Sequence, residues 1–150
     1  MWLLAYLVVF VVATAISAAL VPACKRLARR WGLMARPHPD KARTEPTPLM
    51  GGAAIVASFL ITIVGAYAVV MLARDGALAS LVPEAVRQYA AGMARQGPRL
   101  AIILVGGVGI TVLGLIDDKR GLGPLTKLIV EAAIAVALVL FGVRVSLFIP

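Results

Sequence analysis

The sequence predicts an all-α integral membrane protein, a polytopic bundle of about four transmembrane helices with its N-terminus outside. Of its 150 residues, 61% are hydrophobic and only 15% are charged, and the mean hydropathy of +0.97 exceeds that of ordinary soluble domains. The apolar residues fall into four runs, each near the roughly 20 residues that a helix needs to cross about 30 Å of hydrocarbon. Helices are expected because backbone polar groups in lipid need partners within their own segment.

The net charge of +8 would suggest nucleic acid as a partner of a soluble domain. Here the basic residues lie between the apolar runs, where anionic lipid headgroups are the nearer partner. Binding to nucleic acid is therefore not expected. Cys24 is the only cysteine, which excludes an internal disulfide and a metal cluster built from cysteines.

The first predicted span, residues 2–24, contains no charged residue. No basic residue precedes it, which argues against a cleaved signal peptide. The connection that follows, residues 25–48, holds seven Lys or Arg residues against Asp40 and Glu45. Such a basic loop is expected to stay in the cytoplasm, which places the N-terminus outside.

The second predicted span, residues 49–72, begins near the glycine pair Gly51-Gly52 and returns the chain to the outer face. The outer connection, residues 74–99, has only four basic residues. The third span, residues 100–116, is rich in small residues, which suits close packing against neighbouring helices. It brings the chain back to the cytoplasmic face.

The fourth predicted span, residues 125–143, leads outward again and carries two charged residues. Lys127 and Glu131 have the i,i+4 spacing of neighbours on one helix face. Two interpretations stay open: an ion pair near the membrane interface, or a polar contact to a bound substrate or a partner helix.

Two adjacent carboxylates, Asp117 and Asp118, close the third apolar run and open a second cytoplasmic loop, residues 117–124. Membrane spans usually end in Lys, Arg, Trp or Tyr, so acidic residues there require a cation or a function. Adjacent carboxylates suit Mg²⁺, which takes one or two of them together with substrate phosphates. The structural alternative is that Asp117 caps the helix end and pairs with Lys119 or Arg120.

The predicted topology collects polar residues from both cytoplasmic loops at one membrane face, although more than seventy residues separate some of them. Lysines and arginines beside a metal would hold a diphosphate and neutralise charge during phosphoryl transfer. The residues gathered at this face are Lys41, 44–52, Asp117, Asp118 and Lys127.

These residues also resemble a known family. Residues 114–122, followed by Pro124 and Lys127-Leu128, closely resemble the aspartate-rich motif of the polyprenyl-phosphate N-acetylhexosamine-1-phosphate transferases. This superfamily includes undecaprenyl-phosphate GlcNAc-1-phosphate transferases and phospho-MurNAc-pentapeptide translocases. The first loop is similar to the family's first cytoplasmic motif at Gly32-Leu33, Pro37, Asp40-Lys41, Pro46-Thr47-Pro48 and Gly51-Gly52.

The resemblance covers residues 32–127 and implies that the chain is the N-terminal portion of one membrane transferase domain. It implies transfer of a sugar 1-phosphate from a UDP-N-acetylhexosamine, preferably UDP-GlcNAc, to a polyprenyl phosphate such as undecaprenyl phosphate, with release of UMP. The cofactor would be Mg²⁺, with Mn²⁺ as an alternative. The site would lie at the cytoplasmic face of the plasma (inner) membrane and serve cell-wall or surface-polysaccharide synthesis, and a homodimer is a further expectation.

The resemblance also implies roles for individual residues. Asp117 and Asp118 match the family's catalytic pair, with metal, substrate and base roles that stay unseparated. The positions assigned to substrate binding are Lys41, Thr47, Gly51, Gly52 and Lys127.

Several positions depart from the family pattern, which leaves the sugar donor open. Ala35 and Arg43 stand where many members have Asp and His, and Leu49 or Met50 stands where Arg is common. The segment 47–52 is also similar to the branch that uses UDP-MurNAc-pentapeptide. A non-catalytic membrane subunit and a transporter are the alternatives from other functional classes.

Length is a further departure, because family members run to about twice this chain. Another aspartate motif and a histidine-containing loop lie in later parts of those proteins. His38 cannot replace that histidine, because it lies in the first loop between two prolines. Catalysis by residues 1–150 in isolation is therefore not expected.

Overall fold

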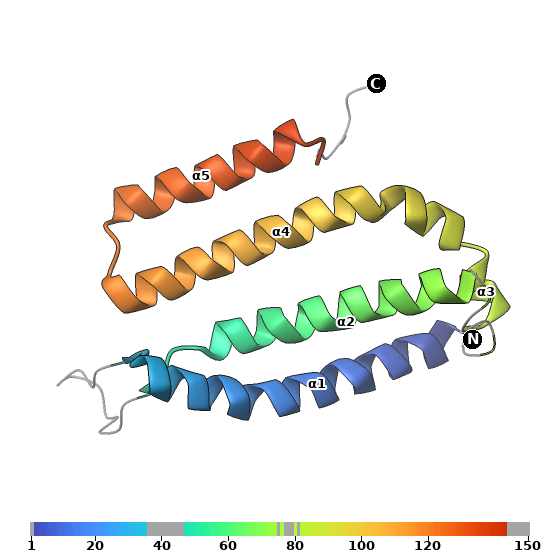
Figure 1. Ribbon diagram of the computed structural model, residues 1–150, viewed down its shortest axis with the longest axis horizontal. Coiled ribbons are helices and arrows are strands. Elements are labelled where there is room, and N and C mark those ends of the chain that lie inside the picture. The colour runs from blue at the N-terminus through green and yellow to red at the C-terminus, as the bar shows by residue number, and fades with distance from the viewer. Residues whose placement is uncertain (1, 36–46, 75, 77–79, 81, 144–150) are drawn as a thin grey trace. The chain divides into compact units, whose positions relative to one another are not determined.

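The structure is a computed structural model and describes residues 2–35, 47–74, 76, 80 and 82–143. Helices dominate this part of the chain, which confirms the predicted all-α fold (Figure 1). Two strands of two residues each interrupt them. The elements are α1 (Trp2–Trp31), β1 (Met34–Ala35), β2 (Thr47–Pro48), α2 (Gly51–Arg74), α3 (Glu84–Arg87), α4 (Ala90–Arg120) and α5 (Pro124–Leu140).

Three helices among the described residues are long and apolar enough to cross a membrane, namely Leu3–Trp31, Gly51–Arg74 and Ala90–Arg120. The chain is thus a multi-pass membrane protein. Helix α5 has 17 residues and a length of about 26 Å, slightly less than the roughly 30 Å of hydrocarbon in a bilayer. A fourth span and an outer N-terminus stay predictions.

The long helices continue beyond the predicted membrane spans. Helix α1 runs on through the basic residues 25–30, and α4 extends from Ala90 to Arg120. Lys and Arg favour helices almost as strongly as Leu, and the thickness of the hydrocarbon limits an apolar run without ending the helix. Asp117 and Asp118 consequently lie in the last turn of α4, and the turn that follows is limited to residues 121–123.

The chain divides into two compact units, each made of two segments. The first comprises Met1–Thr62 and Thr111–Gly123, and the second comprises Ile63–Ile110 and Pro124–Pro150. The first unit contains α1, both strands, the start of α2 and the end of α4. The second contains the rest of α2, α3, the start of α4, and α5.

Within the second unit, glycines allow α4 to approach its neighbours closely. A Cβ atom at Gly106 would come within 2.9 Å of the Leu138 side chain, and one at Gly109 would lie 3.4 Å from Cδ1 of Ile134. Both contacts join α4 to α5. The close packing expected of the small residues in this span is confirmed at these two positions.

Within the first unit, a glycine ends α1 and turns the chain into β1. Gly32 has a φ of +69°, and its N–H donates to the carbonyl oxygen of Arg29. The N–H of Leu33 donates to the carbonyl oxygen of Ala28 over 2.9 Å. This pair of hydrogen bonds is the Schellman motif, in which the residue after the glycine also makes an apolar contact with the helix.

The strands β1 and β2 form a two-residue antiparallel ladder that pairs Met34 with Pro48 and Ala35 with Thr47. A further hydrogen bond of 3.0 Å, from the N–H of Leu49 to the carbonyl oxygen of Leu33, extends the pairing toward α2. The ladder therefore fixes where the first loop leaves α1 and where it enters α2.

Candidate active site

The two carboxylates in the last turn of α4 have different surroundings. Asp117 is half-buried, and its Oδ1 accepts a hydrogen bond of 2.9 Å from the backbone N–H of Leu122. Asp118 is exposed, and its side chain forms no hydrogen bond or ion pair with any residue that the structure describes. Successive residues of a helix point about 100° apart, so the two carboxylates leave α4 in different directions.

Helix α4 ends at a glycine that completes a cap around Asp117. Gly121 has a φ of +64°, and its N–H donates to the carbonyl oxygen of Asp117 over 2.7 Å. Asp117 thus accepts hydrogen bonds from two successive N–H groups, one through its backbone and one through its side chain. The interpretation of Asp117 as a helix-capping residue is confirmed.

The cap depends on the left-handed backbone of Gly121, which gives a direct test. Gly121→Ala is expected to lower the free energy of unfolding by about 1 kcal/mol, equivalent to a melting temperature roughly 2–4 °C lower. A Cβ there would meet no atom within 4 Å, so the cost comes from the backbone alone. Thermal unfolding of the complete protein in detergent measures it.

Gly123 provides the matched control for this substitution. It lies in the same turn and has open space around it, but its φ is outside the left-handed region. Gly123→Ala is expected to leave the melting temperature nearly unchanged. Equal melting temperatures for the two variants would contradict the role assigned to Gly121.

The glycine pair of the first loop lies at the start of α2. Gly51 and Gly52 are its first two residues, both are exposed, and a Cβ on either would meet no atom within 4 Å. The N–H groups in the first turn of a helix have no partner within the helix, and such groups bind phosphate readily. Thr47 lies in β2, four residues before Gly51.

An apolar cluster joins the end of α1 and the start of α2 to the end of α4 that carries Asp117 and Asp118. Ala28, Leu33 and Met50 are at most 5% exposed and form its centre. Leu115 of α4 packs against them, together with three residues of α1 and α2: Cys24, Leu27 and Ala53. Leu115 lies only two residues before Asp117, so this contact brings the two predicted motifs together within the first unit.

Two predicted site residues, Lys41 and Lys127, are not among the described residues of the first unit. Lys41 is outside the described residues, as are His38 and Arg43 of the same loop. Lys127 is half-buried in the first turn of α5 and belongs to the second unit. No ion pair joins Lys127 to Glu131 within the described part of the chain, although their spacing allows one.

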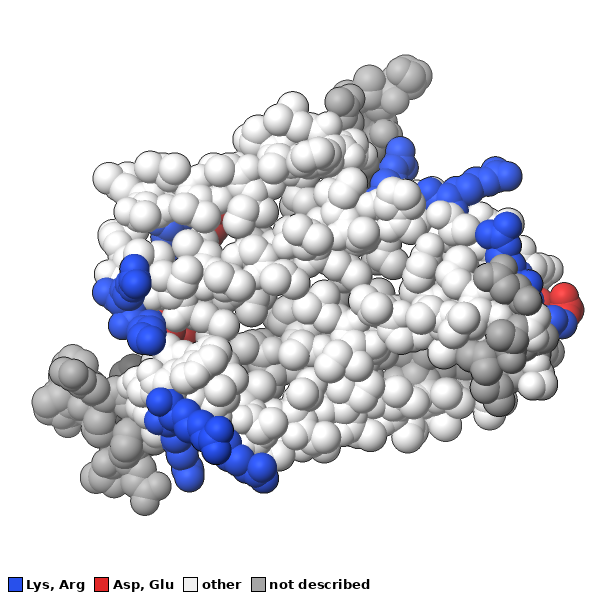
Figure 2. All heavy atoms as spheres, viewed as in Figure 1, with Lys and Arg blue, Asp and Glu red and all other residues white. Residues whose placement is uncertain are grey.

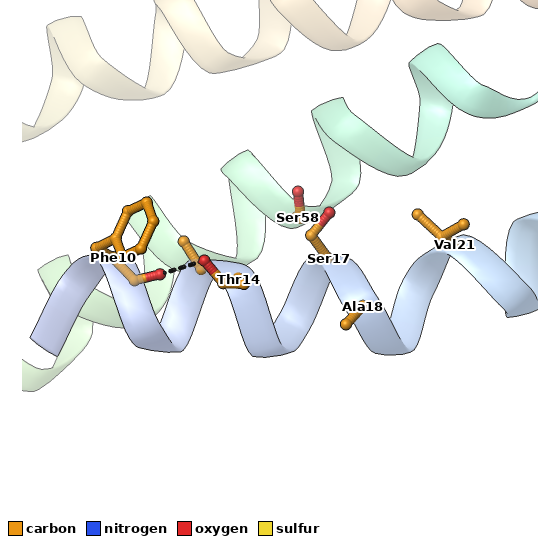
Figure 3. Close-up of a pocket in the computed structure, with 7 residues that line it drawn as sticks. Phe10, Thr14, Ser17, Ala18, Val21 and Ser58 are labelled. Carbon is orange, nitrogen blue, oxygen red and sulfur yellow. Dashed lines mark hydrogen bonds between the residues drawn. The ribbon is translucent and has the colours of Figure 1, made fainter.

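A separate groove lies between α1 and α2 in the first unit (Figure 3). It has a volume of about 570 Å³ and contains no ionisable side chain; its lining is Phe10, Ala13, Thr14, Ser17, Ala18, Val21 and Ser58. Two of its hydroxyl groups are occupied by their own helices, because Thr14 donates to the Phe10 carbonyl oxygen and Ser58 to that of Ile55. The groove therefore offers no charged group for phosphate chemistry.

The donor set at the end of α4 limits which metal it could hold. The described residues contain no group of three or more His, Cys, Asp or Glu side chains placed to bind a metal ion. Two carboxylates alone are too few for a structural zinc site. They do fit Mg²⁺, which commonly takes one or two carboxylates and completes its coordination with water and substrate phosphates.

The strand pairing and the apolar cluster were not predicted. Pairing over two residues on each side of the loop gives no periodic signal in the sequence. Residues 33, 50 and 115 are apolar and stand near motif residues in the sequence, but this gives no signal that they contact one another.

Comparison with known proteins gives matches to curated relatives, whereas no protein-family model and no solved structure matches. Three relatives are each named decaprenyl-phosphate N-acetylglucosaminephosphotransferase. That of Mycolicibacterium smegmatis is 36% identical over 127 residues, which is 83% of this chain and 26% of the relative. Those of Mycobacterium tuberculosis H37Rv and Mycobacterium leprae are both 37% identical, over 84% and 83% of this chain and 27% of each relative.

The matched region is about a quarter of each relative's length, a smaller share than the half that the resemblance implied. It nevertheless covers most of this chain, at an identity above one third. The names of these relatives describe the same class of transferase that the two sequence motifs indicated. Over most of its length the chain is therefore similar to the polyprenyl-phosphate N-acetylglucosamine-1-phosphate transferases, and it spans about a quarter of the length of these relatives.

Proposed function

We propose that the complete protein transfers GlcNAc 1-phosphate from UDP-GlcNAc to a polyprenyl phosphate and releases UMP. The observation that carries this proposal is the contact of Leu115 with the cluster around Leu33 and Met50. Leu115 lies two residues before Asp117, and Met50 directly precedes the two glycines that begin α2, which supports a site formed from both motifs. The names of the relatives support the acceptor class and the transferred group.

The proposed reaction is a single displacement at phosphorus. An oxygen of the polyprenyl phosphate attacks the phosphorus that bears the sugar, and a new P–O bond forms. The bond from that phosphorus to the bridging oxygen of the diphosphate breaks, and UMP leaves with the bridging oxygen. Little covalent chemistry is required of the protein, so positioning and charge neutralisation supply most of the catalysis.

The different surroundings of the carboxylates suggest different roles. Asp118, exposed and without a described protein partner, is the better candidate to meet the metal or the substrate. Asp117, held by the N–H groups of Gly121 and Leu122, orients the end of α4 and adds negative charge to a metal site. When bound there, Mg²⁺ would neutralise the charge of the diphosphate oxygens.

The remaining assignments of the site are also part of this proposal. Gly51 and Gly52 give a phosphate access to the backbone at the start of α2, and Lys41, Thr47 and Lys127 keep their assigned substrate-binding roles. The cytoplasmic location is supported by the distribution of charge. Residues 25–48 contain seven of the fifteen Lys and Arg, residues 117–124 contain two, and Lys127 is the tenth, as expected for the cytoplasmic side of an inner membrane.

The activity can be tested with the complete protein in detergent or nanodiscs. Incubation with UDP-GlcNAc and decaprenyl phosphate is expected to release UMP and to form a lipid-linked GlcNAc diphosphate. EDTA should abolish both products, and excess Mg²⁺ should restore them. UMP release from UDP-MurNAc-pentapeptide alone would favour the other branch of the superfamily, and no release from either donor would contradict the proposal.

A further inference from the structure

The last two turns of α1 carry four basic residues on one side, here called the basic face: Lys25, Arg26, Arg29 and Arg30. At 100° per residue, these positions fall within an arc of about 140°. All four side chains are exposed. Figure 2 shows the resulting patch of Lys and Arg over the C-terminal end of α1.

The opposite side of the same two turns is committed to the protein interior. Cys24, Leu27 and Ala28 contribute to the cluster around Leu33 and Met50. They occupy the arc of the helix that the four basic residues leave. The basic face therefore points away from Met50, which directly precedes α2, and from the contact with Leu115.

The position of the basic face along α1 matches the headgroup layer of a bilayer. The uncharged residues 2–24 make about 34 Å of helix, enough to cross the hydrocarbon. The following residues, 25–31, extend about 10 Å further, enough to pass through the polar headgroup layer of about 5–8 Å. Trp31, at 54% exposed, ends this segment, and tryptophan is enriched at that level of the membrane.

No carboxylate of the described protein neutralises the basic face. Residues 1–39 contain no Asp or Glu, and none of the four basic residues forms an ion pair with another described residue. Four positive charges on one face of a helix, at the depth of the headgroups, are complementary to the phosphates of anionic lipids.

We propose that the basic face of α1 binds the headgroups of anionic phospholipids such as phosphatidylglycerol. The surface is separate from the site at the end of α4, so it goes beyond the proposed transfer reaction and does not depend on it. A polyprenyl phosphate also carries an anionic phosphate. An acceptor lipid bound to this face, however, would lie on the side of α1 opposite to Leu33 and Met50. Phospholipid of the surrounding bilayer is therefore the occupant that fits.

The test uses the complete protein in nanodiscs, with its melting temperature as the readout. Each protein is compared in pure phosphatidylcholine and in phosphatidylcholine mixed with phosphatidylglycerol. Phosphatidylglycerol is expected to raise the melting temperature of the unaltered protein, and high salt should reduce this rise. The combined variant Lys25→Gln, Arg26→Gln, Arg29→Gln and Arg30→Gln should lose more than half of the rise.

A matched control removes the same four charges elsewhere, through Arg74→Gln, Arg87→Gln, Arg95→Gln and Arg99→Gln. This control should keep the rise in full. If the first variant does not fold, the two pairs of substitutions on α1, made separately, should each lose part of the rise. If variant and control lose the same part of the rise in melting temperature, the effect comes from net charge alone and the proposal is overturned. A full rise in the α1 variant would also overturn it.

The acceptor lipid is distinguished by a further comparison. Decaprenyl phosphate is added to neutral discs in place of phosphatidylglycerol. The α1 variant is expected to respond to it as the unaltered protein does. A response to decaprenyl phosphate that depends on the basic face, without any response to phosphatidylglycerol, would overturn the proposal in favour of acceptor binding.

Discussion

Asp118→Asn is expected to lower the turnover of the complete protein by about 100- to 1000-fold, the range found when a charge-stabilising group is removed from an active site. The substitution keeps the shape of the side chain and removes its charge. Because Asp118 is exposed and has no described partner, the free energy of unfolding should change by no more than about 0.5 kcal/mol. UMP release and thermal unfolding, measured on one preparation, separate the two effects.

Two further variants sharpen this result. Asp117→Asn should also lose activity, while its side-chain oxygen can still accept the hydrogen bond from Leu122 and so retain most of the stability. Glu84→Gln removes one exposed carboxylate that forms an ion pair with Arg87 on the same short helix, and it should leave turnover intact. Full activity in Asp118→Asn would remove this residue from the catalytic machinery.

The second large effect concerns the apolar cluster. Leu33→Ala is expected to destabilise the protein by about 2–5 kcal/mol, because Leu33 is only 3% exposed and its truncation leaves a cavity. Leu115→Ala should cost less, since Leu115 is half-buried. If the two side chains share the cluster, the double variant should deviate from additivity by about 0.5–3 kcal/mol. Unfolding of the four proteins gives this coupling energy.

Ile116 is the control for the same cycle. It is adjacent to Leu115 on α4, is 40% exposed and does not belong to the cluster. Ile116→Ala combined with Leu33→Ala should be additive. Additivity of Leu33→Ala with Leu115→Ala as well would mean that the cluster does not connect the loop to α4.

The helical part of the fold follows from the sequence because long apolar runs leave the backbone no other way to satisfy its polar groups. The helix ends do not follow in the same way. The apolar runs end just before Lys25 and Asp117, so hydropathy predicts that a loop begins at each of these residues. The backbone continues as helix in each case until a glycine with positive φ, Gly32 or Gly121, ends it.

The candidate site was predictable in composition and only partly in arrangement. The carboxylates and the glycine pair stand out because polar or flexible residues at the end of a membrane span need a reason. The strand pairing between residues 34–35 and 47–48 and the packing of Leu115 are tertiary effects. They depend on side-chain contacts between distant segments, which local patterns do not record.

The cluster that joins the two motifs also has a consequence for how the protein is made. Met50 follows Leu33 by 17 residues, so the ladder and its loop can form soon after α2 emerges from the ribosome. Leu115 is synthesised another 65 residues later, and only then can it pack against Leu33 and Met50. During biogenesis, the apolar surface of Leu33 and Met50 would therefore stay uncovered until α4 is inserted. Insertion of α4 would bring Leu115 onto this surface and add the two carboxylates to the candidate site in the same step.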